Sequence, residues 1–517
     1  MVTSASPLAS EAGVAMLRAG GNAVDAAVAT AFAIGVVEPQ MSGLGGSGAA
    51  TVWLAESSRP VYLDFYAAQF ADSWRGSPAL TSGPREPGAR DLRGVAIPGS
   101  VAGLLALQEK HGALTRQQIL APAIRLADDG YPVGRILADF IAAGEATMKS
   151  YAAAMQVYFP GGKPVSPGGV IRNPLLADSL RRISRDGVNG FHRGPVAEAI
   201  LSVMNARGHP ATLRDFAEYA PRWKEPLCTD YRGHTVLSAR RRLEVARRAR
   251  PASTPALDPV TQLRPSEPDD VQDDTAGETT HISVVDGAGN AVALTVTNSS
   301  VWGSGAFAAG FFLNDSGFRF TGQNIEQPSR SRWRIRTTTI APTIVLKDRS
   351  VQMVIGAPGA GRIPTEIVQV MVYALDYRLD PLDAVRMPRI FANRGQSPGA
   401  GGAWLHGRAA EGRADHGLRP GHRIVRVRAA LSDCSSGRPV DRRRRSAPRR
   451  PAAGIRRETL STLRDRGHAS GERGLAIPSA PPRARLAVAD TDSDVRSGFR
   501  EHGAPRGCAR PRSPRTP

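Results

Sequence analysis

The alternation of apolar and polar positions in the first 130 residues predicts a series of helices. Ser6-Pro7 forms an N-cap and first-turn pair, and Gly20-Gly21 ends the helix that follows. Asn22 then caps a second helix that has Asp25 in its first turn. The body of this helix, residues 23–35, is apolar on nearly every side, which predicts burial on all faces. Further helices are predicted at 100–111 and 116–129, and a strand at 50–54.

The clearest strand signal is a hairpin. Its two arms, 280–286 and 290–297, are rich in Val, Thr and Ile, and the glycines of 287–289 supply the turn. If the hairpin is symmetric about residue 288, Thr279 lies opposite Thr297 with Cβ atoms about 4.5–5.5 Å apart, so the two hydroxyls can meet. Two more strands are predicted at 343–347 and 351–355. Helices and strands together predict an α+β protein built as a layered sandwich.

Charge is distributed very unevenly along the 517 residues. The net charge is +20, but the stretch from Phe391 to Pro517 holds 27 arginines, no lysine and 11 acidic residues. A basic tail of this kind can bind nucleic acid by counterion release, which makes an arginine-tailed nucleic-acid binder one hypothesis. It is not favoured, because there are no aromatic residues between Trp404 and Phe499 on which bases could stack.

Composition also divides the chain. Residues 240–274, which begin with an arginine run and continue as a Pro/Asp-rich polar segment, are predicted to be a linker. Residues 392–517 are Arg/Pro-rich and are predicted to be a disordered tail. The N-terminus shows no signal peptide, so the cytoplasm is the default location, and the apolar stretch 26–37 is too short to span a bilayer.

Four segments carry distinctive motifs. They are residues 20–46, with Gly20-Gly-Asn-Ala-Val-Asp25 and Ser42-Gly-Leu-Gly-Gly46; Pro98-Gly-Ser-Val-Ala-Gly103; Thr279-Thr-His-Ile-Ser-Val-Val-Asp286; and Gly356-Ala-Pro-Gly-Ala-Gly-Arg-Ile363. In this order they resemble the γ-glutamyltranspeptidases and related acylases over most of residues 1–390. The last motif also imitates a phosphate-binding loop, but Arg362-Ile363 stands where such a loop needs Lys followed by Ser or Thr.

The resemblance implies an N-terminal-nucleophile hydrolase, with a four-layer αββα sandwich and self-cleavage at the Glu278–Thr279 bond. Cleavage frees an α-amino group whose reference pKa is about 7.7–8.0, which can accept the proton of the threonine hydroxyl. Residues 1–278 would form the large subunit and 279–391 the catalytic part of the small one. The two fragments would stay together as a heterodimer, and no metal or organic cofactor is implied. Relatives are often exported.

The resemblance also implies roles for individual residues. Thr279 would be the nucleophile, Thr297 would hydrogen-bond to it, and the N–H groups of Gly359 and Ala360 would form the oxyanion hole. The family usually has two glycines there, so Ala360 is a departure. The implied substrate-binding residues are Tyr66, Ser299, Asn314, Ser316, Arg319, Thr338 and Thr339.

Two departures concern the substrate, expected to be a small amide. Transpeptidases that bind γ-glutamyl groups grip the α-carboxylate with an arginine, where this chain has Tyr66, which lacks a bidentate charged fork. They pair the substrate ammonium with an acidic residue, where this chain has Arg319. An amide such as a dicarboxylate monoamide or one with another acyl side chain therefore fits better than glutathione.

Two further departures concern completeness. Only 43 residues separate Thr235 from Thr279, too few for the several helices that the family carries there, and the family's last strands are not recognisable after Phe391. This pattern indicates an internal deletion and an atypical tail, as reading-frame shifts would produce, and hence an incomplete sandwich. A catalytically inactive remnant is the alternative hypothesis to an active amidohydrolase.

Overall fold

A computed structural model describes residues 1–70, 92–206, 211–239, 278–319, 325–326, 335–336, 338–391, 403–406 and 425–427. All of them belong to one compact unit, Met1–Ala429. The predicted linker at 240–274 and most of the predicted tail from 392 on lie outside the described residues. The described part is an α+β fold of helices and antiparallel sheets.

The helices predicted in the first 130 residues are present. They are α1 (Pro7–Arg18), α2 (Ala23–Val37), α3 (Ser100–His111) and α4 (Arg116–Asp128). The Asn22 side chain accepts hydrogen bonds from the first turn of α2, and Asp25 bonds back to the Asn22 N–H, a capping box. Nearly every residue of α2 is buried, so the predicted burial on all faces is confirmed.

Several helices were not predicted. They are α5 (Arg135–Ala143), α6 (Glu145–Met148), α7 (Ala152–Tyr158), α8 (Pro174–Asp186), α9 (Asn189–His192), α10 (Pro195–Asn205), α11 (Leu213–Ala217), α14 (Ile363–Leu375) and α15 (Pro381–Arg386). Among the described helices, none combines the length and the apolar character needed to span a bilayer.

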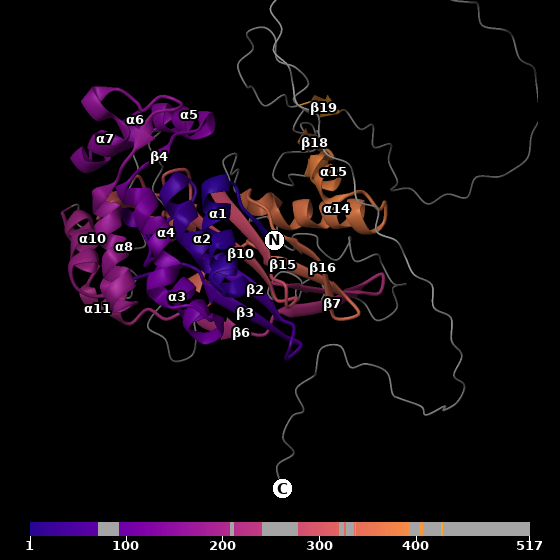
Figure 1. Cartoon of the computed structure of the whole chain (residues 1–517). Coiled ribbons are helices and arrows are strands. Elements are labelled where there is room, and N and C mark those ends of the chain that lie inside the picture. The colour runs from indigo at the N-terminus through magenta and orange to yellow at the C-terminus, as the bar shows by residue number, and fades with distance from the viewer. Residues whose placement is uncertain are drawn as a thin grey trace, which may run out of the picture. The chain divides into compact units, whose positions relative to one another are not determined.

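The larger sheet has the strand order β1-β9-β10-β2-β3-β6 and is antiparallel throughout. Its strands are β1 (Val2–Thr3), β9 (Glu278–Val285), β10 (Ala291–Ser299), β2 (Ser47–Leu54), β3 (Arg59–Phe65) and β6 (Arg222–Lys224). The predicted hairpin is β9–β10, with Ala291 opposite Val285 and Val296 opposite Thr280, as symmetry about residue 288 requires. Helix α2 and its neighbours cover one face of this sheet (Figure 1).

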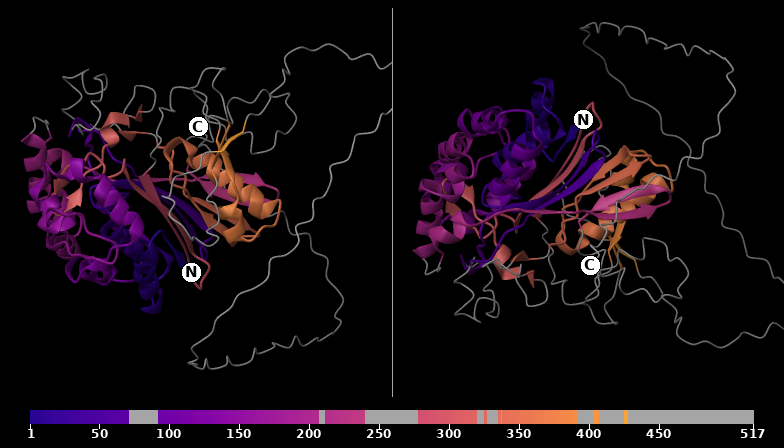
Figure 2. Two further views of the ribbon diagram at one scale, coloured as in Figure 1. Left: turned by 90° about the horizontal axis from the view of Figure 1, so that it is seen from above. Right: turned by 90° about the horizontal axis from the view of Figure 1, so that it is seen from below.

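The smaller sheet has the order β16-β15-β8-β7 and packs against the other face of the larger one (Figure 2). Its strands are β16 (Ser350–Ile355), β15 (Thr343–Lys347), β8 (His234–Ser238) and β7 (Leu227–Tyr231). Trp53 and Ala293 of the larger sheet meet Ile344 and Leu346 of β15 in one buried cluster. Val345 shares a second cluster with residues of α14, which lies on the outer side of the smaller sheet.

Four smaller sheets complete the described backbone. Three of these are pairs: β4 (Tyr131–Pro132) with β5 (Val170–Ile171), β11 (Phe307–Ala308) with β12 (Phe311–Phe312), and β13 (Ile325–Glu326) with β14 (Ile335–Arg336). The fourth is a three-stranded sheet of order β17 (Arg389–Phe391), β18 (Ala403–His406) and β19 (Val425–Val427). The last two strands lie within the region that the sequence predicts to be a tail.

Candidate active site

A β-bulge faces Thr279. Along β9 and β10, Val296 pairs with Thr280 but Ser299 pairs with Glu278, so two residues, Thr297 and Asn298, oppose Thr279 alone. The Thr279 hydroxyl donates to Thr297 Oγ1 at 3.3 Å, and the Ser299 N–H donates to the same oxygen at 2.8 Å. Ser299 has φ 73°, a left-handed conformation that is uncommon for serine and concentrates at functional sites. The predicted contact between the two threonine hydroxyls is therefore present.

A chain of hydroxyl groups continues from the bulge. Ser299 Oγ lies 2.6 Å from Ser316 Oγ and 3.3 Å from the Tyr66 phenol oxygen. All three side chains are buried. The structure thus brings together three predicted substrate-binding residues, Tyr66, Ser299 and Ser316. Ser299 is the residue that directly follows the Thr297–Asn298 bulge.

Tyr66 is held by its backbone. Its N–H donates to Asp64 Oδ1 at 3.0 Å, and its carbonyl accepts from the Tyr219 phenol at 2.9 Å. The other Asp64 oxygen binds Arg222 at 2.7 Å and Lys224 at 3.0 Å, so the carboxylate charge is balanced within the protein. The sequence does not predict that Asp64, Tyr219, Arg222 and Lys224 hold Tyr66 in place. Their contacts join strand β3 to strand β6 and to the segment before β6, which are far apart in the chain.

The glycine-rich turn before α14 lies against β9, the strand that contains Thr279. A Cβ atom added to Gly356 would lie 2.1 Å from Nδ1 of His281, two residues beyond Thr279 on the same strand. Gly359 has φ 120° and Ala360 φ 49°. The turn that contains the two predicted oxyanion donors therefore packs beside β9, and its backbone needs left-handed conformations.

The family model for γ-glutamyltranspeptidase matches residues 9–243 and 239–397, which is well over half of the chain. The chain belongs to the γ-glutamyltranspeptidase family. Its similarity to a glutathione hydrolase proenzyme of Pseudomonas sp. (strain A14) is 30% identity over 468 residues, covering 75% of this chain and 80% of the relative. An acylase ACY 1 proenzyme of Pseudomonas sp. (strain SE83) is 28% identical over 463 residues, covering 76% and 83%.

A solved structure of this fold is also similar. The cephalosporin acylase from Bacillus halodurans superimposes with a TM-score of 0.62 and 24% identity, over 79% of this chain and 91% of that one. This likeness concerns the fold. The γ-glutamyltranspeptidase family relationship supports an amidohydrolase or transpeptidase activity for the chain.

One family position turns out to be structural in this chain. The Asn314 amide donates to the carbonyls of Gly45 and Ala96 and accepts from the N–H groups of Ala96 and Ser316. These four bonds use the full hydrogen-bonding capacity of the side chain, which is buried, so none is left for a substrate. The prediction that Asn314 binds substrate is corrected accordingly: Asn314 ties Ser316 to the loop before β2.

The structure describes fewer contacts for the remaining predicted substrate-binding residues, Thr338, Thr339 and Arg319. Thr338 Oγ1 accepts from the Ile340 N–H at 3.2 Å, and Ile340 lies in the same buried cluster as Tyr66. Thr339 is partly buried beside it. For Arg319 only the backbone is described, at the end of the 3-10 turn Ser316–Arg319. Their substrate-binding roles in this γ-glutamyltranspeptidase relative stay predictions.

One buried titratable group, His281, lies on strand β9, and another, Glu38, lies beside it. His281 bonds Thr295 Oγ1 at 2.8 Å and Ser283 Oγ at 3.2 Å, and burial lowers its pKa to about 3, so the imidazole is neutral at pH 7. Burial raises the pKa of Glu38, at the end of α2, to about 7, and the Thr280 hydroxyl acts in the opposite direction. His281 belongs to the motif of residues 279–286. Its closeness to Gly356 results from tertiary packing and is not evident from the sequence.

Replacing Glu38 by glutamine is expected to stabilise the protein at alkaline pH. The folded pKa of about 7 exceeds the ordinary value of 4.5, so stability is complete below pH 4.5 and is lost as pH rises through 7. The variant should equal the wild type near pH 4.5 and exceed it above pH 7 by up to about 3 kcal/mol. Urea unfolding of the variant and the wild type at about pH 4.5 and pH 8 measures the difference. Equal unfolding curves for the two proteins at pH 8 would show that the Glu38 carboxyl is not destabilised by burial.

Replacing Ala360 tests the left-handed turn. A side chain in this conformation costs about 1 kcal/mol, which glycine avoids, and β-branched residues fit it worst. Ala360→Gly is expected to keep full activity, and Ala360→Val to lose at least roughly tenfold in kcat as the N–H groups predicted to form the oxyanion hole shift. Steady-state assays of the two variants distinguish them; equal activity of the valine variant would show that the turn does not need this backbone.

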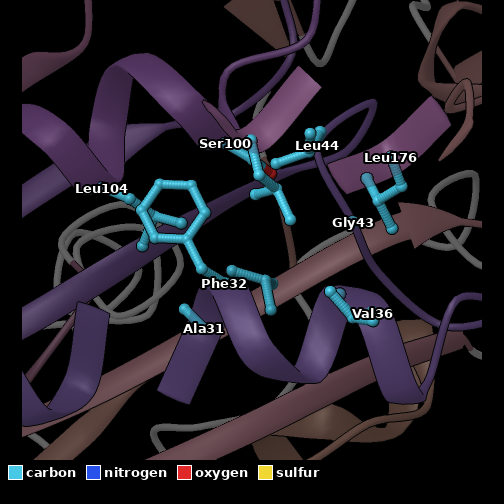
Figure 3. Close-up of a pocket in the computed structure, with 11 residues that line it drawn as sticks. Ala31, Phe32, Val36, Gly43, Leu44, Ser100, Leu104 and Leu176 are labelled. Carbon is cyan, nitrogen blue, oxygen red and sulfur yellow. The ribbon is translucent and has the colours of Figure 1, made fainter. Parts of the chain in front are cut away.

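The structure also contains a small apolar pocket away from these residues. Phe32 and Val36 of α2, Leu104 of α3 and Leu176 of α8 line it (Figure 3). It lies on the helix side of the larger sheet, and none of the predicted site residues lines it. In the described ranges, no group of His, Cys, Asp and Glu side chains is arranged to hold a metal ion.

Proposed function

We propose that the chain is a self-cleaving amidohydrolase or acyltransferase whose nucleophile is Thr279. The observation that carries this proposal is the 3.3 Å bond from the Thr279 hydroxyl to Thr297, made at a bulge opposite the Glu278–Thr279 peptide. A bulge beside an active site re-aims a side chain, here the hydroxyl that meets the nucleophile. An intact-mass spectrum with N-terminal sequencing tests the proposal: a fragment beginning at Thr279 supports it, and soluble protein that stays whole contradicts it.

The chemistry follows from the freed chain end. The Thr279 amine takes the hydroxyl proton while the oxygen attacks the substrate amide carbon, and the N–H groups of Gly359 and Ala360 stabilise the oxyanion. Collapse breaks the C–N bond, and the amine leaves with the proton held by the Thr279 nitrogen. Water or a second amine then attacks the ester and releases Thr279 in its starting form.

The strand order supports a stable heterodimer of the fragments 1–278 and 279–517. Strands β9 and β10 of the second fragment lie between β1 and β2 of the first. In the smaller sheet, β15 of the second fragment pairs with β8 of the first. Separating the fragments would open the three strand ladders that join them, β1–β9, β10–β2 and β15–β8, and the two buried clusters that they share. We assign the layers to the N-terminal-nucleophile αββα sandwich, with residues 279–391 as its catalytic part and 392–517 as an appended tail.

The acyl-binding side of the site supports a substrate other than a γ-glutamyl group. Next to the bulge, Tyr66 presents a phenol where an arginine would hold an α-carboxylate, and its neighbours Ser299 and Ser316 are neutral hydroxyls. The nearby Asp64 is engaged by Arg222 and Lys224 and is not available to an ammonium group. An acyl group without an α-amino acid head therefore suits the site better.

A pair of chromogenic anilides separates the two substrate classes. The glutaryl anilide is expected to exceed the γ-glutamyl anilide in kcat/KM by at least roughly tenfold, the size of one lost charge-assisted bond pair. Both substrates share the leaving group, so the ratio reports the acyl group alone. Preference for the γ-glutamyl compound would overturn the substrate assignment and leave the nucleophile assignment intact.

The family relationship does not favour the other two hypotheses, which are a catalytically inactive remnant and an arginine-tailed nucleic-acid binder.

A further inference from the structure

Ser47 occupies a position beside the nucleophile that no motif singles out. It is the first residue of β2, and the register places it directly opposite Thr297 of β10. Thr297 in turn contacts Thr279 of β9. Because opposed residues of antiparallel strands point to the same face, the three side chains form a transverse row of hydroxyls across three strands.

The row faces the space between the two sheets. Ala49, two residues after Ser47, lies in the buried cluster that also contains Tyr66 and Ala357 of the glycine-rich turn. Side chains two apart on a strand share a face, so Ser47 points to the side that holds the oxyanion turn. The intervening Gly48 faces Phe65 on the helix side.

The Ser47 hydroxyl is buried without a hydrogen-bond partner. Its residue is 0% exposed, and Oγ meets no donor or acceptor. Such a group is destabilising in a folded protein and requires an explanation in function or hydration. An apolar residue of the same size would be more stable here.

A serine opposite a threonine can form a hydrogen bond in this fold. Ser238 of β8 and Thr343 of β15 lie one position beyond the paired Leu237 and Ile344 of two antiparallel strands, and their hydroxyl oxygens lie 2.8 Å apart. One rotation about the Cα–Cβ bond carries the Ser47 oxygen between staggered positions. The Ser47 hydroxyl can therefore turn toward Thr297.

We propose that Ser47 is a positioning residue that hydrogen-bonds to the Thr297 hydroxyl while Thr279 reacts. It acts through Thr297 and does not contact the substrate. An additional bond restricts rotation of the Thr297 hydroxyl, which keeps the oxygen aimed at Thr279 as the proton of Thr279 leaves. The proposal rests on the proposed function, because it requires Thr279 to be the nucleophile.

Two serine-to-alanine variants test this role. Ser47→Ala is expected to slow self-cleavage and to lower kcat by about tenfold, the effect of one neutral hydrogen bond, with KM unchanged. Its unfolding midpoint should equal or exceed that of the wild type, since an unpartnered hydroxyl is removed. Ser100→Ala is the matched control. Ser100 Oγ is also buried without a partner, but it lies in the apolar pocket on the helix side of the sheet (Figure 3), so wild-type rates are expected.

Each possible result of the Ser47→Ala experiment supports or overturns the positioning role. Wild-type rates in Ser47→Ala, or a raised KM with unchanged kcat, overturn the positioning role. Failure of Ser47→Ala to fold also overturns it, because the hydroxyl would then be structural. A wild-type protein that is neither cleaved nor active removes the proposed function together with this inference. Cleaved and active wild type beside an unaffected Ser47→Ala removes only the role of Ser47.

Discussion

Replacing Thr279 with alanine is expected to leave the chain whole and without hydrolase activity. The variant lacks the oxygen that would attack both the Glu278 carbonyl and the substrate, so the loss should reach the detection limit, beyond roughly 10⁴-fold. A denaturing gel shows one band for the variant and two for the wild type, and an anilide assay measures the activity.

Thr279→Ser is the matched control for this change. Serine keeps the hydroxyl and the α-amine, so cleavage should still occur at the same bond, more slowly because the rotation of the side chain is less restricted. Thr280→Ala, one residue along the same strand and on its opposite face, should be cleaved like the wild type. Two bands from Thr279→Ala would show that another residue cuts the chain.

Replacing Gly356 with alanine is expected to lower kcat by roughly 10²–10³-fold, the effect of misplacing an oxyanion donor. The added Cβ would lie 2.1 Å from His281 Nδ1, far inside contact distance, so either the turn or the imidazole must move. Overpacking of this kind costs about 1–3 kcal/mol of stability in addition. Steady-state kinetics and urea unfolding measure the two effects.

Gly287→Ala is the matched control for Gly356→Ala. Gly287 lies in the β9–β10 turn, and a Cβ there would meet nothing within 4 Å. The same substitution should therefore leave kcat and the unfolding midpoint near wild-type values. If Gly356→Ala also behaves like wild type, the contact between the glycine-rich turn and His281 does not hold the oxyanion donors in place.

Local signals in the sequence were sufficient for the elements around the site. Helix α2 was predicted from Asn22, Asp25 and an unbroken apolar body, and the structure shows the capping box and the burial. The hairpin was predicted from its glycine turn and its β-branched arms. Such signals act within a few residues, so the chain displays them before any tertiary contact forms.

Other helices were missed although some carried signals. Helix α8 has Asn173 as its N-cap and Pro174 in its first turn, which is a helix-start signal present in the sequence. Helices α6 and α9 have four residues each and depend on packing for their stability. Propensity alone does not specify such short segments.

The motifs predict the family, and the symmetry of the hairpin predicts the contact between Thr279 and Thr297, because both are local properties of the sequence. The role of Thr279 as nucleophile stays a prediction. Three features follow from tertiary packing alone: the Asn314 side chain is fully hydrogen-bonded to backbone groups, Tyr66 reaches Ser299, and Ser47 lies opposite Thr297. These contacts join residues up to 269 positions apart. Their partners are chosen by strand order and register, which the packing of the whole sheet settles.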